Sequence, residues 1–283
     1  MNSAERFLQD FHQRHPGTTP PAFAGLSLAG RGSSYDILAT TLKALPPEAR
    51  VLDLGCGDGF LLDLLARHHP TARLLGVDMS ATELQAAHVR LAGRGLLLEE
   101  RAQALSLASA SVDAVLSHLA LMLMSDIEQV LQEVHRVLVP GGQLSAVVGR
   151  EFLLGELGQH YLQVFRAAAR RDHLAHLPLV DPRAQSEDGW RQLLDRHFTA
   201  LHFEDLDLPW TPTFEELWVA LGDTYDLDRL SPANRARMKQ ELHDATRHLQ
   251  CADGTLPTGW GLLLIQARAC LLYTSDAADD SLR

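Results

Sequence analysis

The chain has 283 residues, 46% of them hydrophobic, and a formal net charge of −11. This length and composition predict one sizeable core with additions that need not form a second domain. The acidic balance argues against a broad nucleic-acid surface, which needs clustered Lys and Arg, and favours a small-molecule partner.

The sequence carries no signal for a membrane or for secretion. No apolar run reaches the length of about 18 residues that a membrane helix needs, and the first residues are polar and charged. The cysteines, Cys56, Cys251 and Cys270, have spacings typical of neither a disulfide framework nor a zinc site. We therefore expect a cytoplasmic protein, monomeric or homodimeric, with no metal and no membrane partner.

The N-terminal residues predict two helices separated by a loop. Residues 3–15 place Phe7, Leu8 and Phe11 at helical spacing among charges. Glycine, proline and serine dominate residues 18–34, which favours a loop. Residues 35–45 form a second amphipathic pattern, which two prolines stop just before the first strand.

Residues 51–60 predict a buried strand, a glycine turn and the start of a helix. Glycines at alternate positions, Gly55 and Gly57 among them, let the backbone bend sharply and approach a ligand. A dinucleotide fingerprint would need its third glycine at Phe60. Asp53, before the glycines, suits a ligand with an ammonium and a sulfonium better than a pyrophosphate. A tight turn without a ligand is the alternative.

Residues 73–78 predict a second strand that ends in an acid, Asp78, 21 positions after Gly57. A carboxylate at this place can accept both hydroxyl hydrogens of a ribose diol. Met79 follows, where it can pack on an adenine face, and a capping box then opens a helix. The alternative role of Asp78 is a plain charge near the start of that helix.

Residues 96–100 and 111–117 predict the third and fourth strands. Ligands bind at the carboxyl ends of strands in open α/β sheets, so Ser117 and His118 point at the site. An unperturbed histidine titrates close to working pH, and His118 is therefore a candidate base that takes a proton from an acceptor. The alternative is a histidine that only hydrogen-bonds the cofactor or a neighbouring carbonyl.

The remaining residues predict further helices and strands. An amphipathic pattern over 126–138 ends at Pro140-Gly141-Gly142, and an apolar strand follows over 143–149. Beyond it the patterns predict helices over 152–171, 190–198, 214–221 and 234–249, a sixth strand over 200–208 and a last strand over 259–267.

The order of these motifs resembles the class I S-adenosylmethionine (SAM)-dependent methyltransferases. The likeness is carried by D-L-G-C-G-D-G at 53–59, the strand-end Asp78, the segment 102–117 and R-V-L-V-P-G-G at 136–142. It implies an α/β fold, a Rossmann-like doubly wound seven-stranded sheet whose last strand is antiparallel, with helical cap insertions. It also implies SAM as the cofactor and S-adenosylhomocysteine (SAH) as the product. The cofactor-binding residues that it implies are Asp53, Gly55, Gly57, Asp78, Met79, Ala102 and Ser117.

The chain departs from the family pattern at Arg101. Many relatives have an acid there, whose carboxylate accepts from the adenine amino group, and an arginine cannot accept. The backbone N–H of Ala102 can still meet the adenine ring. The contact to the amino group must then come from another source, such as Gln103 or water.

The resemblance also divides the chain. Residues 1–34 are candidates for a lid, 35–149 for the SAM-binding core, and 150–269 for the rest of the core with cap insertions at about 150–185 and 209–256. Residues 270–280 resemble a translated sequencing adapter, so we set 270–283 aside as a non-native tail.

We therefore predict an enzyme that moves a methyl group from SAM to an O, N or C atom of a small-molecule acceptor by in-line displacement. Aromatic side chains are candidates to line the acceptor pocket: Tyr35, Tyr161, Trp210, Trp218 and Tyr225. The alternative is a non-catalytic sensor or partner subunit that binds SAM or SAH. A nicotinamide oxidoreductase is disfavoured by Phe60.

Overall fold

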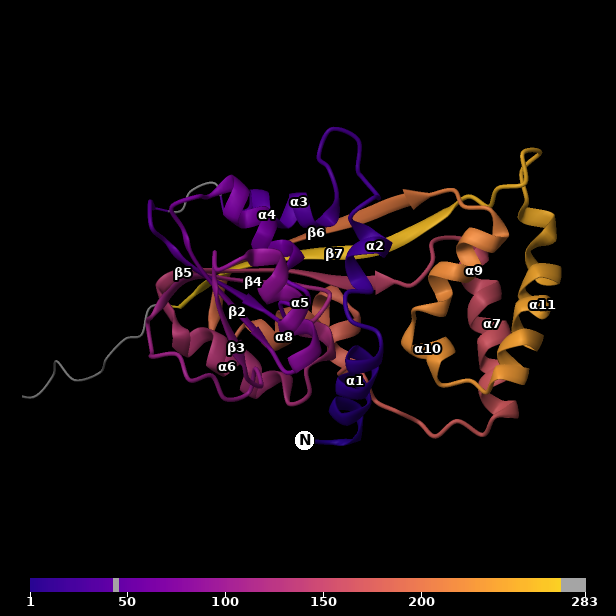
Figure 1. Ribbon diagram of the computed structural model, residues 1–283, viewed down its shortest axis with the longest axis horizontal. Coiled ribbons are helices and arrows are strands. Elements are labelled where there is room, and N and C mark those ends of the chain that lie inside the picture. Colours follow the sequence, from indigo (N-terminus) through magenta and orange to yellow (C-terminus); the bar gives the residue numbers. More distant parts are fainter. Residues whose placement is uncertain (43–45, 271–283) are drawn as a thin grey trace, which may run out of the picture.

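The computed structural model describes residues 1–42 and 46–270 and contains one seven-stranded sheet flanked by helices (Figure 1). The strand order is β3-β2-β1-β4-β5-β7-β6. β7 is antiparallel to β5 and β6, and the other paired strands are parallel. The predicted doubly wound sheet with an antiparallel last strand is confirmed. The strands are β1 (Arg50–Leu54), β2 (Arg73–Asp78), β3 (Leu96–Glu99), β4 (Val112–His118), β5 (Leu138–Glu151), β6 (Phe198–Trp210) and β7 (Thr258–Ala269).

Helices cover both faces of the sheet. On one face lie α3 (Ser34–Thr40), α4 (Phe60–His68) and α5 (Ala81–Leu91), and on the other lie α6 (Ile127–Val137) and α8 (Glu187–Leu194). Neighbouring residues of β1 point to opposite faces, so Val51 joins the first apolar cluster and Leu52 the second. This double burial explains why the parallel strands read as nearly continuous apolar runs.

Several boundaries differ from the predicted ones. The helix expected over 35–45 ends at Thr40, and its last predicted residue, Leu45, lies outside the described residues. The loop expected over 18–34 contains a short helix, α2 (Thr19–Phe23), which begins with prolines whose fixed φ suits a first helical turn. The helix expected over 190–198 is α8, which begins earlier because the Ser186 side chain caps it. Of the predicted non-native tail, only Cys270 is described.

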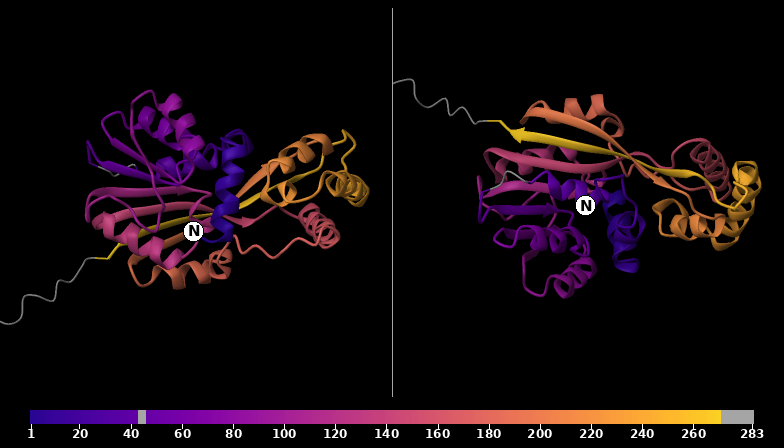
Figure 2. Two further views of the ribbon diagram at one scale, coloured as in Figure 1. Left: turned by 60° about the horizontal axis from the view of Figure 1, so that its bottom comes forward. Right: turned by 90° about the horizontal axis from the view of Figure 1, so that it is seen from above.

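A group of helices, which we call the cap, lies beyond one end of the sheet (Figures 1 and 2). The long strands β5, β6 and β7 extend toward it: β5 leads into α7, β6 leads into α9, and the chain returns from α11 through β7. The cap consists of α7 (Glu156–Arg171), α9 (Phe214–Gly222), α10 (Tyr225–Asp228) and α11 (Pro232–Thr246). Short 3-10 turns complete the described elements: η1 (Leu121–Leu123), η2 (Pro182–Gln185) and η3 (Arg247–Leu249).

The N-terminal helix α1 (Ser3–Arg14) stands between the sheet and the cap (Figure 2). Its Phe11 ring meets the Tyr225 ring of α10 edge to face, with centroids 4.7 Å apart. Arg14 forms a two-pronged pair with Asp228 of α10, with both N···O distances 2.8 Å. The helix therefore packs against the cap through aromatic contacts to Tyr225 and an ion pair to Asp228.

The turn between β1 and α4 depends on glycine. Gly55, Gly57 and Gly59 have φ angles of 75°, 51° and 77°, a region that costs other residues about 1–2 kcal/mol. A Cβ on Gly55 would also lie 2.4 Å from the Cβ of Ala120, inside the contact distance of two carbons. The turn can therefore approach the residues after β4 only because this side chain is absent.

We predict that Gly55→Ala destabilises the protein more than Gly93→Ala does. Gly93 has a φ of 84° with nothing within 4 Å of its added Cβ. Alanine at Gly93 therefore has the same unfavourable positive φ but no steric overlap with a neighbouring side chain. The overlap at Gly55 should add roughly 1–3 kcal/mol to the loss in free energy of unfolding. Urea denaturation of both variants measures the difference, and equal losses would show that the approach to Ala120 is not tight.

Candidate functional site

A cavity opens at the carboxyl ends of β1, β2 and β4, where the strand order changes direction. The N-terminal segment and α10 of the cap also contribute to its walls. Most of the predicted site residues line it: Tyr35, Asp53, Gly55, Gly57, Asp78, Met79, Ala102, His118 and Tyr225. Ser117, Tyr161, Trp210 and Trp218 do not appear among its walls.

Asp53, in β1, is a buried carboxylate without a partner. Its side chain lines the cavity, the residue is 1% exposed, and neither oxygen accepts a hydrogen bond from the described residues. Burial raises the pKa of Asp53 well above its usual range, and the nearby charges of Asp78 and Asp58 raise it further. An ionised carboxylate in this position is costly unless a cation or a hydrogen-bond donor joins it.

Asp78 ties the end of β2 to the glycine turn. Its Oδ2 accepts a hydrogen bond from the Gly57 N–H and its Oδ1 from the Ser80 N–H, both at 2.9 Å. Burial raises the pKa of Asp78, and these two bonds oppose the rise. Each carboxylate oxygen offers about two acceptor sites, so both oxygens retain room for a hydroxyl of a ligand.

Ser117 supports the site from behind rather than lining it. Its Oγ donates to the carbonyl oxygen of Leu54 at 2.8 Å and accepts from the Leu121 N–H at 3.2 Å. These bonds join the ends of β1 and β4 and fix the start of η1. The side chain is fully buried.

His118 is buried among aromatic rings at the cavity wall. It stacks on Tyr35 with centroids 3.6 Å apart, and its Nε2 lies 2.9 Å from the Ser34 hydroxyl. Its Nδ1 has no partner among the described residues. Burial lowers the pKa of His118 to about 3. The ring is therefore neutral at pH 7, where protonating it costs roughly 5 kcal/mol.

The predicted acceptor residues separate into two groups. Tyr35 and Tyr225 line the cavity, and the Tyr225 hydroxyl lies 3.0 Å from Nε2 of His12. Tyr161 is buried inside the cap, where its hydroxyl donates to Asp226 at 3.3 Å. Trp210 stacks on a neighbouring tryptophan of β7, and Trp218 packs against the apolar core.

The sequence analysis expected residues 1–34 to form a lid but named none of the α1 side chains that line the cavity. Glu5, Leu8 and His12 all line the cavity, and their spacing of three and four residues places them on one face of the helix. His12 Nδ1 lies 2.9 Å from Oε1 of Glu83, a buried acid of α5. Two polar residues flanking a leucine on one helix face were the signal in the sequence.

A second group of titratable side chains lies in the cap. Oε1 of Glu156 lies 3.4 Å from Nε2 of His160 and 2.9 Å from Nε2 of His248. All three ligand atoms lie within 4.8 Å of one another. The residues are partly or fully exposed and do not line the cavity, and their contacts join the first turn of α7 to η3.

Comparisons with known proteins agree with this geometry. Residues 52–146 match the model of a family described as a methyltransferase domain. The chain is 33% identical over 144 residues to a malonyl-[acyl-carrier protein] O-methyltransferase of Methylococcus capsulatus, over 50% of this chain and 52% of that protein. The chain thus spans about half, or less, of the length of the curated relatives that it matches first.

Solved structures share the fold at low sequence identity. The YcgJ protein of Bacillus subtilis has a TM-score of 0.60 and 18% identity, over 84% of this chain and 98% of that one. The [4+2]-cyclase SpnF has a TM-score of 0.55 and 17% identity, over 95% and 93% of the two chains.

Among the described helices, none is both long and apolar enough to cross a bilayer.

We predict that Asp53→Asn stabilises the protein without ligand at neutral pH. The folded state raises the pKa of Asp53, so its contribution to stability is full below the unfolded pKa of about 4 and is lost as pH rises through the folded pKa. The variant should therefore be more stable than the wild type near pH 7, with the gain shrinking toward pH 4. Urea denaturation between pH 4 and pH 8 measures this, and a gain that is constant over that range would contradict it.

We predict that His118 does not titrate between pH 5 and pH 8. Burial holds its pKa at about 3, so its ring carbon resonances should stay fixed over this range in NMR spectra. His118→Gln assigns the signal by its disappearance. A resonance that moves with a midpoint near pH 6.5 would show that the ring is accessible to protons.

Proposed function

We propose that this chain is a class I SAM-dependent methyltransferase that transfers a methyl group to an O, N or C atom of a small molecule, a proposal supported by the match of residues 52–146 to a methyltransferase domain. The observation that carries the proposal is Asp53, a buried carboxylate that lines the cavity beside the glycine turn with both oxygens unpartnered by described residues. Such a group fits a ligand that brings its own positive charge, and SAM brings an ammonium.

We propose that SAM lies across the carboxyl ends of β1, β2 and β3, with one part of the molecule at each strand end. Asp53 and the turn glycines Gly55 and Gly57 would hold the methionine portion at β1, and Asp78 would hold the ribose diol at β2. Met79 and Ala102, which follow β2 and β3, would meet the adenine. Ser117 would act indirectly, because its bonds fix the backbone behind the site.

When bound, SAM supplies a methyl group on a sulfonium, which leaves as the neutral thioether SAH when an acceptor lone pair displaces it. The protein aligns the acceptor with the carbon–sulfur bond and excludes water. Residues 1–34 would act as a lid for this purpose, since Glu5, Leu8 and His12 close the cavity on the side of the cap.

For His118 we keep two roles, a base toward the acceptor and a neutral hydrogen-bonding group. Its burial supports the second, because an imidazolium is strongly disfavoured there. A neutral ring can still accept or donate one hydrogen bond through Nδ1, which has no partner among the described residues. In this role His118 would orient a substrate group and leave the proton to solvent or to the acceptor itself.

The acceptor would occupy the part of the cavity next to the cap. Tyr225 of α10 lines the cavity from the cap, and Tyr35, Phe60, Leu123 and Met124 add aromatic and apolar surface to its walls. Small-molecule sites are mostly apolar with a few placed polar groups. The family match ends at residue 146, before the cap begins, so the likeness supports methyl transfer more strongly than any particular acceptor.

The rival proposal is a protein that binds SAM or SAH without methylating anything. This rival proposal is supported by the structural likeness to a protein described as a [4+2]-cyclase, because the same fold can serve several different chemistries. An acceptor-dependent release of SAH from labelled SAM, tested over a metabolite panel, separates the two proposals.

We predict that SAH binds the wild-type protein and that Asp53→Asn and Asp78→Ala each weaken binding roughly 10–100-fold, the effect of losing a charge-assisted hydrogen bond. Asp195→Asn, at an exposed aspartate after α8, is the matched control and should bind SAH normally. Isothermal titration calorimetry measures all four proteins. The absence of heat with the wild-type protein at high micromolar concentration would remove the proposed function.

A further inference from the structure

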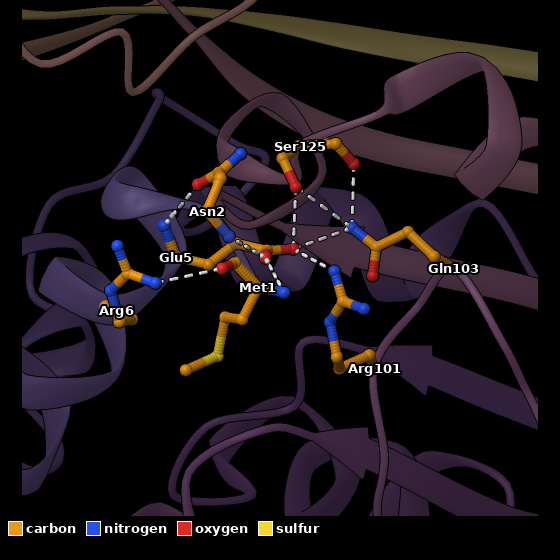
Figure 3. A network of polar contacts seen from close by, with 7 residues as sticks. All are labelled: Met1, Asn2, Glu5, Arg6, Arg101, Gln103 and Ser125. Carbon is orange, nitrogen blue, oxygen red and sulfur yellow. Dashed lines mark hydrogen bonds and ion pairs between the residues drawn. The ribbon is translucent and has the colours of Figure 1, made fainter.

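The polar network at the adenine end of the cavity joins α1 to the segments after β3 and η1 (Figure 3). Arg101 stands where the family pattern has an acceptor for the adenine amino group, and it donates to Oε1 of Glu5 at 2.6 Å. The guanidinium is therefore engaged with the N-terminal helix, and a guanidinium offers donors only. An acceptor for the amino group must be another side chain.

We propose that Gln103 accepts the hydrogen bond of the adenine amino group and that Glu5 and Ser125 orient its amide for this contact. The inference rests on the function proposed above and assigns to that site a specificity-determining residue, Gln103, and two positioning residues.

The orientation of the Gln103 amide is fixed by its donors. Its Nε2 donates to the carbonyl oxygen of Ser125 at 2.7 Å and to Oε1 of Glu5 at 3.1 Å. These two bonds use both hydrogens of the amide nitrogen. A flipped amide would place its oxygen against a carboxylate and a carbonyl, two acceptors, which is unfavourable. The Ser125 hydroxyl also lies within 3.4 Å of the same nitrogen.

The Gln103 carbonyl oxygen is consequently left as a free acceptor. Figure 3 shows it on the side of the amide that faces away from Ser125 and Glu5. It accepts no hydrogen bond from the described residues, and Gln103 lines the cavity. The neighbouring backbone N–H of Ala102, also at the cavity wall, donates to no described residue. One acceptor and one donor thus lie on adjacent residues.

This pair complements one edge of adenine. That edge carries an amino donor beside a ring nitrogen that accepts, which matches the Gln103 oxygen and the Ala102 N–H. The position agrees with the sheet, because β3 pairs with β2 and the Glu100 N–H donates to the Asp78 carbonyl at 3.1 Å. A base attached to a ribose at Asp78 would therefore extend toward the segment after β3.

Glu5 orients the amide and does not itself bind adenine. Its Oε1 already accepts from Arg101, Gln103 and Ser125, and its Oε2 accepts from the Asn2 N–H at 3.0 Å. The three donors fill the acceptor sites of Oε1, the oxygen bonded to Gln103, so that oxygen has none left for adenine. Burial alone would raise the pKa of Glu5, but the bonds from Arg101, Ser125 and Asn2 outweigh it and lower the pKa, so the carboxylate stays ionised at neutral pH.

The test compares SAH with S-inosylhomocysteine, in which an oxo group replaces the adenine amino group and the neighbouring ring nitrogen carries hydrogen. The oxo group would face the Gln103 oxygen, which places two acceptors together. The ring N–H would face the Ala102 N–H, which places two donors together. In isothermal titration calorimetry the wild-type protein should bind SAH roughly 10–100-fold more tightly than the analogue. Gln103→Leu should reduce this ratio several-fold without abolishing it, because the Ala102 N–H still opposes the ring N–H of the analogue. Glu5→Gln should also reduce it, because the amide is then free to flip.

The ratio of the two affinities distinguishes a lost contact to adenine from a general loss of structure, because a destabilised fold weakens the binding of both ligands equally. Gln132→Leu, at an exposed glutamine of α6, is the control and should keep the wild-type ratio. Equal affinities in the wild-type protein, or an unchanged ratio in both Gln103→Leu and Glu5→Gln, would overturn the inference while leaving SAH binding intact. Absence of SAH binding by the wild-type protein would overturn the proposed function as well.

Discussion

The hydrogen bond from the Gly57 N–H to the Asp78 carboxylate sets the geometry on which the cavity depends. It joins the turn after β1 to the end of β2, and the second oxygen of Asp78 holds the start of α5 through Ser80. The glycine turn, the strand-end acid and the helix therefore move as one unit. Because Gly57 has a positive φ, its N–H can point at this carboxylate, and a branched residue there would strain the same turn.

That arrangement concentrates negative charge. Asp53, Asp58, Asp78 and Glu83 are all buried or nearly so around one cavity. The structure offsets part of the repulsion with partners from helices: the Arg90 guanidinium of α5 pairs with Asp58, and His12 of α1 lies within hydrogen-bond distance of Glu83. Asp53 receives no such partner from the described residues. Of these four acids, Asp53 alone accepts no hydrogen bond from the described residues, and it lies beside the glycine turn, where a cationic ligand group would have most to gain.

The sequence predicted the sheet well because its signals are local. Apolar runs, the turn glycines and the strand-end acid occur within a few residues of one another, and Asp53, Gly55, Gly57 and Asp78 do line one cavity. The role of α1 could not be predicted in the same way. Amphipathic spacing shows that one face of a helix is buried, but it does not show against which distant segment.

The same limit applies to the aromatic residues and to His118. Tyr161, Trp210 and Trp218 carry the spacing of buried aromatics, and the structure buries them against other parts of the chain and not at the cavity wall. The sequence analysis placed His118 correctly at the end of β4. Its neutral state depends on Tyr35 and Ser34, which lie over eighty positions earlier in the chain.

The N-terminal helix contacts both the segment after β3 and the cap. Through Glu5 it orients groups at the end of β3, and through His12 it bonds both to Glu83 of the core and to Tyr225 of the cap. Tyr225 of the cap and Arg101 of the core therefore contact the same helix. This chain of contacts physically connects the cap to the end of the cavity at Arg101 and Gln103, because the helix runs through 12 residues between its contacts with Arg101 and Asp228.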